Sequence, residues 1–317
     1  MMNSTLSLPS FRQGYTAFLL GLFWIGLSTQ AYSADPSAFV VENVHEYFPD
    51  QVGNEWVYRG RIVEGGLIQI AEKDSRFTNV SKVMGKETID SVEVTVFHDT
   101  NPGDQGPSDS YYRRDAAGIR YYGAKPGTTL ERQLVPYQIV RFPMEVPSSF
   151  EQFNRKGLEL GLDIDRDGES EKVDILAISS VQGLDEMIVP AGAYSEVIRM
   201  EAKMTMQVHL SESGKTLQGT DTMIVWFARG VGLLKYIERQ TIPSAQSENE
   251  RMVEVTEELE KVSLASELAS LPGPKPSAVS VHPHAFLGTL SQIANSLRLP
   301  SNLMMAASAP VLPAIQP

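Results

Sequence analysis

The sequence predicts a mainly β protein. About ten short runs of alternating or β-branched residues are separated by turns rich in glycine and proline, which is the pattern of an antiparallel sheet. Nothing in the chain resembles the regular alternation of strands and helices that a parallel α/β fold requires. After residue 263 the pattern changes, because eight prolines fall between Pro272 and Pro317. The sequence therefore indicates a β-rich body followed by a different segment.

The first strand is expected at Glu55–Val63, where aromatic and β-branched residues lie between a Val-Gly-Asn turn and a Gly-Gly break. Ser91–Phe97 alternates strictly, with three valines on one face, as a half-buried strand does. Tyr111–Arg114 and Gly118–Tyr122 flank a short turn and predict a hairpin. Its two pairs of tyrosines are either cross-strand partners or a stacking platform for a sugar.

The later strands follow in the same way. In Val197–Leu210, methionines and other apolar residues alternate with polar ones, which places His209 on the polar face. Thr222–Ala228 is apolar on both faces and is expected to be a central strand, and a Gly-Val-Gly bend leads into Leu233–Arg239. Glu250–Leu264 has helical spacing and a capping box but also a β-like centre, and we favour a closing strand.

The segment Asp163–Asp174, with the sequence DIDRDGESEKVD, has the spacing of a calcium-binding loop. Calcium takes six to eight oxygen ligands at about 2.3–2.6 Å, which a 12-residue loop supplies from positions 1, 3, 5, 7, 9 and 12, with glycine at position 6. Gly168 occupies the sixth position. The expected ligands of a Ca²⁺ ion are Asp163, Asp165, Asp167, Glu169 through its backbone carbonyl, Glu171 and Asp174. Six acids so close together repel one another, and a bound cation would relieve that repulsion.

The residues around this loop favour strands over the helices of an EF-hand. Gly157 and Gly161 are unfavourable in a helix, each by about 1 kcal/mol relative to alanine. Val173–Val181 is rich in β-branched residues and favours a strand. We therefore expect a calcium loop between two strands, with a metal-free acidic hairpin as the alternative.

The chain begins with the features of a secretory signal peptide, expected at residues 1–33. Arg12 is its only charged residue, the apolar run AFLLGLFWIGL follows at residues 17–27, and a small-x-small pattern ends at Ser33. Cleavage near Ser33 or Ala34 would leave an exported protein, periplasmic or extracellular. The apolar run is too short to span a bilayer, and no later stretch approaches about 20 residues, so no transmembrane segment is expected in the mature chain.

The acidic composition of the chain and its lack of cysteine make some partners and modifications unfavourable. The chain has 27 Lys and Arg against 39 Asp and Glu, and no cysteine. This acidity disfavours nucleic acid and anionic lipid surfaces as partners. Without cysteine neither a disulfide nor a lipid-modified N-terminus can form, so the fold depends on its core or on a metal.

The expected domain organisation is a single β-rich domain at residues 34–264 and a flexible tail at residues 265–317. The tail has only three charged residues and many prolines, and residues 286–299 have the spacing of one short amphipathic helix. We expect the tail to contact a protein partner, whose identity the sequence does not give.

Several motifs, taken together over residues 47–264, resemble a group of bacterial exported β-proteins and lipoproteins of unknown function, related to the DUF3108 type and sometimes labelled TapB-like. The motifs are Tyr47-Phe-Pro49, Val52-Gly-Asn54 with Trp56 and Tyr58, the DxDxDG loop, Val189-Pro-Ala-Gly192 and Ala228-Arg-Gly-Val-Gly232. The resemblance implies a curved antiparallel sheet or half-barrel, LolA/LppX-like, and transfers no catalytic residue. This chain departs from many members by lacking a lipobox cysteine and by its Pro-rich tail.

No catalytic motif is present: the sequence has no GxSxG, HExxH, nucleophilic cysteine or Gly-rich phosphate loop. We therefore expect a protein that is not an enzyme, although carboxylate pairs of an unrecognised hydrolase depend on separation in space. The favoured function is a calcium-binding structural or interaction component of the cell envelope or exterior. The alternative is a periplasmic carrier for a lipid or other apolar ligand, in which Trp56, Tyr58, Trp226, Phe227 and the methionines face a cavity and do not simply fill the core.

Overall fold

The computed structural model describes residues 38–66, 73–242 and 251–265. The predicted signal peptide at residues 1–33 lies outside the described residues. So does the predicted tail after residue 265, with its expected helix at residues 286–299 and its expected partner contacts. No helix in the described part of the chain is both long and apolar enough to cross a membrane.

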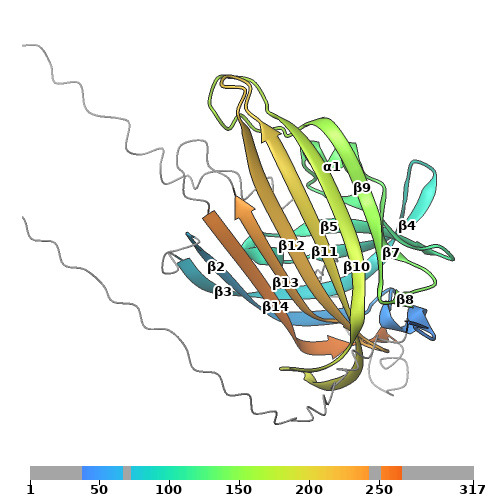
Figure 1. Ribbon diagram of the computed structural model, residues 1–317. Coiled ribbons are helices and arrows are strands. Elements are labelled where there is room, and N and C mark those ends of the chain that lie inside the picture. Colours follow the sequence, from blue (N-terminus) through green and yellow to red (C-terminus); the bar gives the residue numbers. More distant parts are fainter. Residues whose placement is uncertain (1–37, 67–72, 243–250, 266–317) are drawn as a thin grey trace, which may run out of the picture. The chain divides into compact units, whose positions relative to one another are not determined.

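Twelve of the described strands form one antiparallel sheet, in the order β7-β6-β5-β4-β3-β2-β14-β13-β12-β11-β10-β9 (Figure 1). Their bounds are β2 Glu55–Gly66, β3 Lys73–Ile89, β4 Val92–Asp99, β5 Ser108–Asp115, β6 Gly118–Lys125, β7 Tyr137–Arg141, β9 Ser148–Glu159, β10 Lys172–Val189, β11 Gly192–His209, β12 Thr216–Ala228, β13 Gly232–Ile242 and β14 Arg251–Ser263. A separate two-stranded ladder joins β1 (Phe39–Val40) to β8 (Glu145–Val146). The predicted mainly β fold is confirmed.

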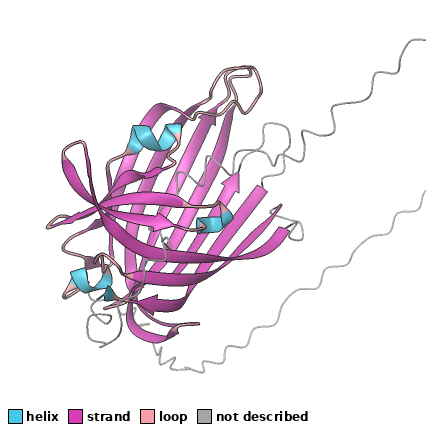
Figure 2. Cartoon of the chain, turned by 180° about the vertical axis from the view of Figure 1, so that it is seen from behind, coloured by secondary structure: helices cyan, strands magenta, loops and turns pink. Residues whose placement is uncertain are grey.

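The helical segments are short and lie beside the sheet (Figure 2). They are α1 (Thr129–Leu134) and two 3-10 helices at Val44–Tyr47 and Pro102–Asp104. The sequence analysis did not predict α1, although its capping box is formed: Glu131 N–H donates to Thr128 Oγ1 at 3.0 Å, and Thr128 N–H donates to Glu131 Oε2 at 3.2 Å.

The chain order explains how the sheet curves into an almost closed barrel. β2 pairs with β14, so the first and last long strands of the described chain are neighbours in the middle of the sheet. The two edges are then β7 and β9, which come from the middle of the sequence and face each other across the curved sheet. The expected half-barrel is thus observed, with twelve strands in a single curved layer.

The two edge strands meet at a seam, which we define as Tyr137–Arg141 of β7 and Ser148–Glu159 of β9. No strand pairing joins them in the described residues. Side chains bridge the seam instead: the rings of Tyr137 and Phe153 lie 4.9 Å apart edge to face, and the Arg141 guanidinium lies 4.5 Å from the centre of the Phe150 ring. The barrel is therefore closed there by side chains alone.

Residue alternation within the strands decides what faces the interior. In β14, Val253, Val255 and Leu259 are buried and alternate with more exposed residues, so Arg251–Ser263 of the ambiguous segment is a strand, as favoured. In β12 the four consecutive residues Val225–Ala228 are buried, which confirms a strand covered on both faces.

One pair of tyrosines in the predicted hairpin consists of cross-strand partners. Tyr112 in β5 lies opposite Tyr121 in β6, and their ring centres are 5.3 Å apart. Both side chains are buried, at 4% and 1% exposure. They fill the interior of the sheet and do not form an exposed platform for a sugar.

Candidate functional site

The acidic loop lies between two strands, as the glycines around it predicted. β9 ends at Glu159, β10 begins at Lys172, and the residues between them form no regular secondary structure. Backbone hydrogen bonds close the base of the loop, from Leu160 N–H to the Glu171 carbonyl at 2.9 Å and from Glu171 N–H to the Leu162 carbonyl at 3.0 Å. The loop is thus an extension of the β9-β10 hairpin.

The Asp163 carboxylate shapes the turn within this loop. Its Oδ1 accepts hydrogen bonds from the backbone N–H groups of Arg166 at 2.6 Å and Asp167 at 3.1 Å, and its Oδ2 accepts one from Gly168 at 3.0 Å. Gly168 has φ +100°, a conformation that strains any other residue. The aspartate at the first position and the glycine at the sixth are therefore both required by the turn.

Three of the predicted ligands converge. Asp163, Asp165 and Glu171 each offer a carboxylate oxygen, and these oxygens lie within 4.8 Å of one another. Glu171 is completely buried: its Oε1 accepts a hydrogen bond from Ile164 N–H at 3.0 Å, and its Oε2 accepts bonds from the Ser211 backbone N–H at 3.2 Å and hydroxyl at 3.0 Å. Glu171 therefore holds the loop against the β11-β12 turn.

Asp165 leaves one oxygen of this group without a partner. Its Oδ2 accepts a hydrogen bond from Glu212 N–H at 3.1 Å. Its Oδ1 is buried and has no hydrogen-bond partner among the described residues. Because a buried acceptor without a partner is unfavourable, a cation between the three carboxylates would supply the interaction that Oδ1 lacks.

The predicted ligands Asp167 and Asp174 do not belong to this group of side chains, and the predicted role of the Glu169 carbonyl stays a prediction. Asp167 is exposed, and its Oδ1 accepts a hydrogen bond from Glu169 N–H at 2.8 Å, which lowers the pKa of Asp167. Asp174 lies in β10, where it accepts a hydrogen bond from Gly157 N–H at 2.8 Å and lies 3.6 Å from His209 Nε2. The Gly157 bond is the main cause of the lowered pKa of Asp174. Since the strand has begun before residue 174, its direction carries Asp174 away from the three converging acids.

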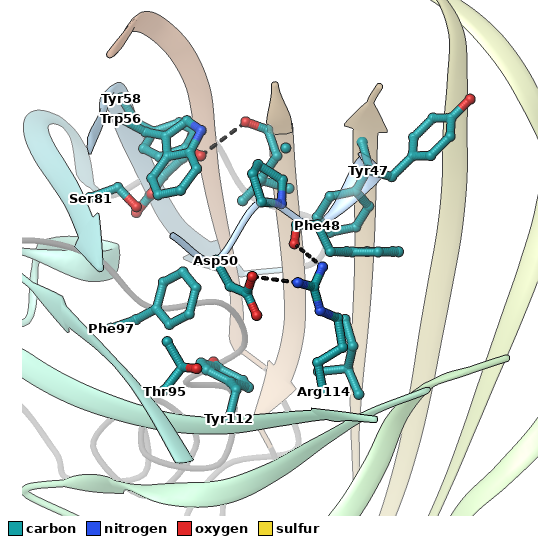
Figure 3. Close-up of a pocket in the computed structure, with 16 residues that line it drawn as sticks. Tyr47, Phe48, Asp50, Trp56, Tyr58, Ser81, Thr95, Phe97, Tyr112 and Arg114 are labelled. Atoms are coloured by element: carbon teal, nitrogen blue, oxygen red, sulfur yellow. Dashed lines mark hydrogen bonds and ion pairs between the residues drawn. The ribbon is translucent and has the colours of Figure 1, made fainter. Parts of the chain in front are cut away.

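A second site lies inside the curved sheet, where aromatic side chains surround a concavity (Figure 3). Its empty space, including the part open to solvent, is about 720 Å³. The lining comes from β2 to β6, from β12 to β14 and from the segment before β2. The aromatic members are Tyr47, Phe48, Trp56, Tyr58, Phe97, Tyr112 and Phe227.

The polar atoms of the concavity's aromatic walls are bonded within the protein. Trp56 Nε1–H donates to the Val231 carbonyl at 2.6 Å, and the Tyr58 hydroxyl donates to the Leu233 carbonyl at 2.9 Å. The rings of Trp56 and Phe97 are stacked at 6.4 Å. The walls therefore present a mainly apolar surface to anything that enters.

One ion pair lies at the concavity (Figure 3). Arg114 Nη2 donates to Asp50 Oδ1 at 2.5 Å, and Arg114 Nη1 donates to the backbone carbonyls of Phe48 at 2.9 Å and His45 at 3.2 Å. The Asp50 carboxylate thus balances the guanidinium charge. These bonds fix the segment that precedes β2 against the opposite strand, β5.

A buried acid, Glu257, also lines the concavity. It accepts hydrogen bonds from Asn79 Nδ2 at 3.0 and 2.9 Å and from Gly103 N–H at 3.1 Å. The pKa of the Tyr58 hydroxyl is raised well above its usual value, first by burial and then by the charge of Glu257. Tyr58 therefore stays protonated and acts here as a hydrogen-bond donor.

The predicted cavity residues are correct in part. Trp56, Tyr58 and Phe227 line the concavity, but Trp226 does not. Trp226 Nε1–H donates to Asp185 Oδ2 at 3.0 Å, and the Arg199 guanidinium lies 5.8 Å from the Trp226 ring. The prediction for Trp226 was wrong because neighbouring residues in a strand point to opposite faces.

Sequence reasoning missed Thr95 and Phe97 as lining residues. It assigned the buried face of β4 to the valines, and Val94 and Val96 are indeed buried, in a small cluster with Tyr111. Thr95 and Phe97 point the other way, into the concavity. Phe97 is a large aromatic residue on the face of this strand that was expected to be exposed. Its presence there indicates that both faces of the strand are covered.

Comparisons with known proteins identify no family for this chain. No family model matches the chain, and no curated protein matches it. The resemblance to the DUF3108-type group therefore stays a prediction. Two solved structures match: a protein from Bacteroides fragilis predicted to be exported, with a YmcC-like fold, at 12% identity and a TM-score of 0.30, and a predicted lipoprotein from Parabacteroides distasonis at 13% identity and a TM-score of 0.28. Each match covers 68% of this chain and 98% of the other.

Proposed function

We propose that this protein is an exported, non-catalytic binding protein that carries an apolar ligand in the aromatic concavity of its curved sheet. The observation behind the proposal is that seven aromatic side chains surround a space open to solvent. Ligand sites in proteins are concave, mostly apolar and largely preformed, and this concavity has all three properties. Of the two functions that the sequence suggested, the geometry favours the carrier.

The polar groups around the concavity also support binding without catalysis. Arg114 is paired with Asp50, and Glu257 is bonded to Asn79 and Gly103. A general base or nucleophile must reach the reacting atom, but these groups are already bonded to the protein. Their arrangement stabilises the walls.

Binding of a neutral apolar dye, N-phenyl-1-naphthylamine, tests the proposal by fluorescence titration of the full chain. Thr95 lines the concavity and is half-buried, so Thr95→Phe fills space that the dye needs, and we expect at least a tenfold loss of affinity. Thr78→Phe is the matched control, because Thr78 is exposed on the neighbouring strand β3. Equal affinities of the two variants would refute the carrier.

We also propose that the loop at residues 163–174 binds Ca²⁺, with Asp163, Asp165 and Glu171 as its carboxylate ligands. The convergence of these three acids and the unpartnered Oδ1 of Asp165 support this proposal. A site of this kind outside the cytoplasm is expected to bind with a Kd of about 10⁻⁴–10⁻³ M. The ion would stiffen the β9-β10 hairpin.

Thermal unfolding of the full chain in calcium, in magnesium and in EDTA tests the calcium site. At a hundredfold excess over Kd, calcium is expected to stabilise the fold by about 2.7 kcal/mol. Asp165→Asn should remove this increment, whereas Asp174→Asn should keep it, because Asp174 lies outside the converging group. A calcium response that survives in Asp165→Asn would place the ion elsewhere.

A further inference from the structure

Several acids are buried inside the described part of the sheet. Besides Glu171 of the loop, the buried carboxyl groups are Asp99, Glu131, Asp221, Glu238 and Glu257, each at most 6% exposed. No lysine, arginine or histidine is buried among the described residues. Because ionised carboxylates are costly in a low-dielectric interior, such acids must be protonated or meet a cation.

Asp221 is the buried acid whose bonding is least complete. It is 1% exposed, yet neither of its carboxylate oxygens has a hydrogen-bond partner of ordinary geometry in the described part of the chain. Asp221 lies in β12 opposite Gln240 of β13, and the Gln240 side-chain oxygen also has no partner there. Three acceptor atoms on two facing residues thus lack donors.

The donors beside Asp221 are shared with Glu238: hydrogen bonding to Gln240 lowers the pKa of Asp221, whereas hydrogen bonding to Glu238 raises it. The Gln240 amide nitrogen donates to Glu238 Oε1 at 2.8 Å, and the Tyr236 hydroxyl donates to Glu238 Oε2. Glu238 adds a second carboxyl group beside Asp221, which with burial raises the pKa of Asp221 well above its usual value. The Gln240 amide and the Tyr236 hydroxyl thus both serve Glu238.

Asp221 opens onto a cavity that is separate from the aromatic concavity. The two spaces share no lining residue. The Asp221 cavity encloses about 370 Å³ of empty space, including the part open to solvent, and its apolar walls include Tyr137, Phe153, Met204 and Met223. An adjoining space of about 260 Å³ shares four of the same lining residues and extends the apolar surface.

No lysine in the lining neutralises Asp221. Lys203 contributes to the rim of the cavity, but its side chain is 68% exposed and its ammonium group lies 3.2 Å from Glu201. Lys203 and Asp221 also lie on opposite faces of the sheet, because the cross-strand partner of Asp221 is the next residue, Met204. The acid inside the cavity therefore has no basic partner in the cavity walls, and a guest amine would supply one.

We propose that the cavity beside Asp221 binds the primary ammonium group of a small apolar amine. A primary ammonium has one positive charge and N–H donors for both oxygens of the Asp221 carboxyl group, which would give up its proton on binding. The methionines and aromatic rings receive the hydrocarbon part. This site is additional to the proposed carrier function and does not depend on it.

Isothermal titration of the full chain with hexylamine, hexan-1-ol and hexyltrimethylammonium tests the proposal at neutral pH. Hexylammonium should bind at least tenfold more tightly than the other two, because the alcohol lacks the charge and the quaternary amine lacks N–H donors. Equal binding of the three, or no binding of hexylamine, would overturn it. A short-chain phosphatidylethanolamine, titrated in parallel, shows whether a lipid head group also supplies the ammonium.

Three variants locate the site. Asp221→Asn keeps the shape but replaces the ionisable acid with an amide, and Ala177→Leu fills the cavity at another lining residue; each should weaken hexylamine binding at least tenfold. Glu131→Gln is the matched control, because Glu131 is an equally buried acid bonded to Tyr121 and Thr128, and it should bind as the wild type does. Unchanged binding by Asp221→Asn would refute the site. Since the concavity is separate, naphthylamine binding should not respond to Asp221→Asn.

Discussion

At the scale of single residues, the interior acids Asp221 and Glu238 make stability depend on pH. Burial raises the pKa of both groups, and the two carboxyl groups also interact with each other. Tyr137, Tyr236 and Glu257 are further titratable groups near them. The unfolded chain loses these protons near pH 4, earlier than the folded chain does. The free energy of unfolding therefore falls as the pH rises from about 4 through the raised pKa values, by up to about 1.4 kcal/mol per pH unit for each retained proton.

Asp221→Asn should flatten this dependence, because an amide has no proton to retain. Urea unfolding between pH 4.5 and pH 8 measures it, and the variant should become more stable than the wild type toward the upper end of that range. Glu254→Gln, at a partly exposed position on β14, should follow the wild-type curve. A parallel offset of the Asp221→Asn curve at every pH would contradict the retained proton. The sequence did contain a signal here, since Asp221 shares its strand face with Met223 and Val225.

At the scale of elements, α1 joins one edge of the sheet to the other. The Gln133 amide nitrogen donates to the Glu159 carbonyl at 2.8 Å, and Gln133 Oε1 accepts a hydrogen bond from Glu159 N–H at 3.0 Å. This side chain of α1 thereby satisfies the backbone at the end of β9 as a neighbouring strand would. Sequence periodicity could not reveal α1, because six residues are too few to repeat a helical pattern, and only its capping box was visible.

Removal of the N-cap should therefore weaken both the helix α1 and its attachment to the end of β9. Thr128→Ala is expected to cost about 1 kcal/mol, because the Glu131 backbone N–H loses its acceptor. Thr128→Ser keeps the hydroxyl and should be close to the wild type. Urea unfolding measures both, and hydrogen exchange at Glu159 reports whether the Gln133 bond is lost along with the cap. An alanine variant as stable as the serine variant would mean that the cap adds nothing.

At the scale of the whole molecule, the sequence predicted the strands but not their neighbours. Alternation identified β4, a turn between tyrosine pairs identified the hairpin of β5 and β6, and the resemblance implied a curved sheet. The pairing of β2 with β14 joins residues about 200 positions apart, and no local pattern contains that information. The concavity depends on this pairing, because Trp56 and Phe227 reach it from distant parts of the chain. The calcium loop could be predicted because its residues are contiguous in the sequence. The Asp221 cavity could not be predicted, because its lining residues come from several separate strands.

The seam gives this barrel a mechanical property that a fully hydrogen-bonded barrel lacks. Pulling two paired strands apart breaks a row of backbone bonds, but no such row joins β7 to β9 in the described residues. Ring contacts and the Arg141–Phe150 contact join these two strands, and the Gln133 bonds join α1 to β9. Tyr137 and Phe153, whose rings meet there, are also walls of the Asp221 cavity. The wall beside the buried acid is thus held by side-chain contacts and not by a strand ladder in the described residues, and a guest molecule reaching Asp221 from that side would leave the sheet unbroken.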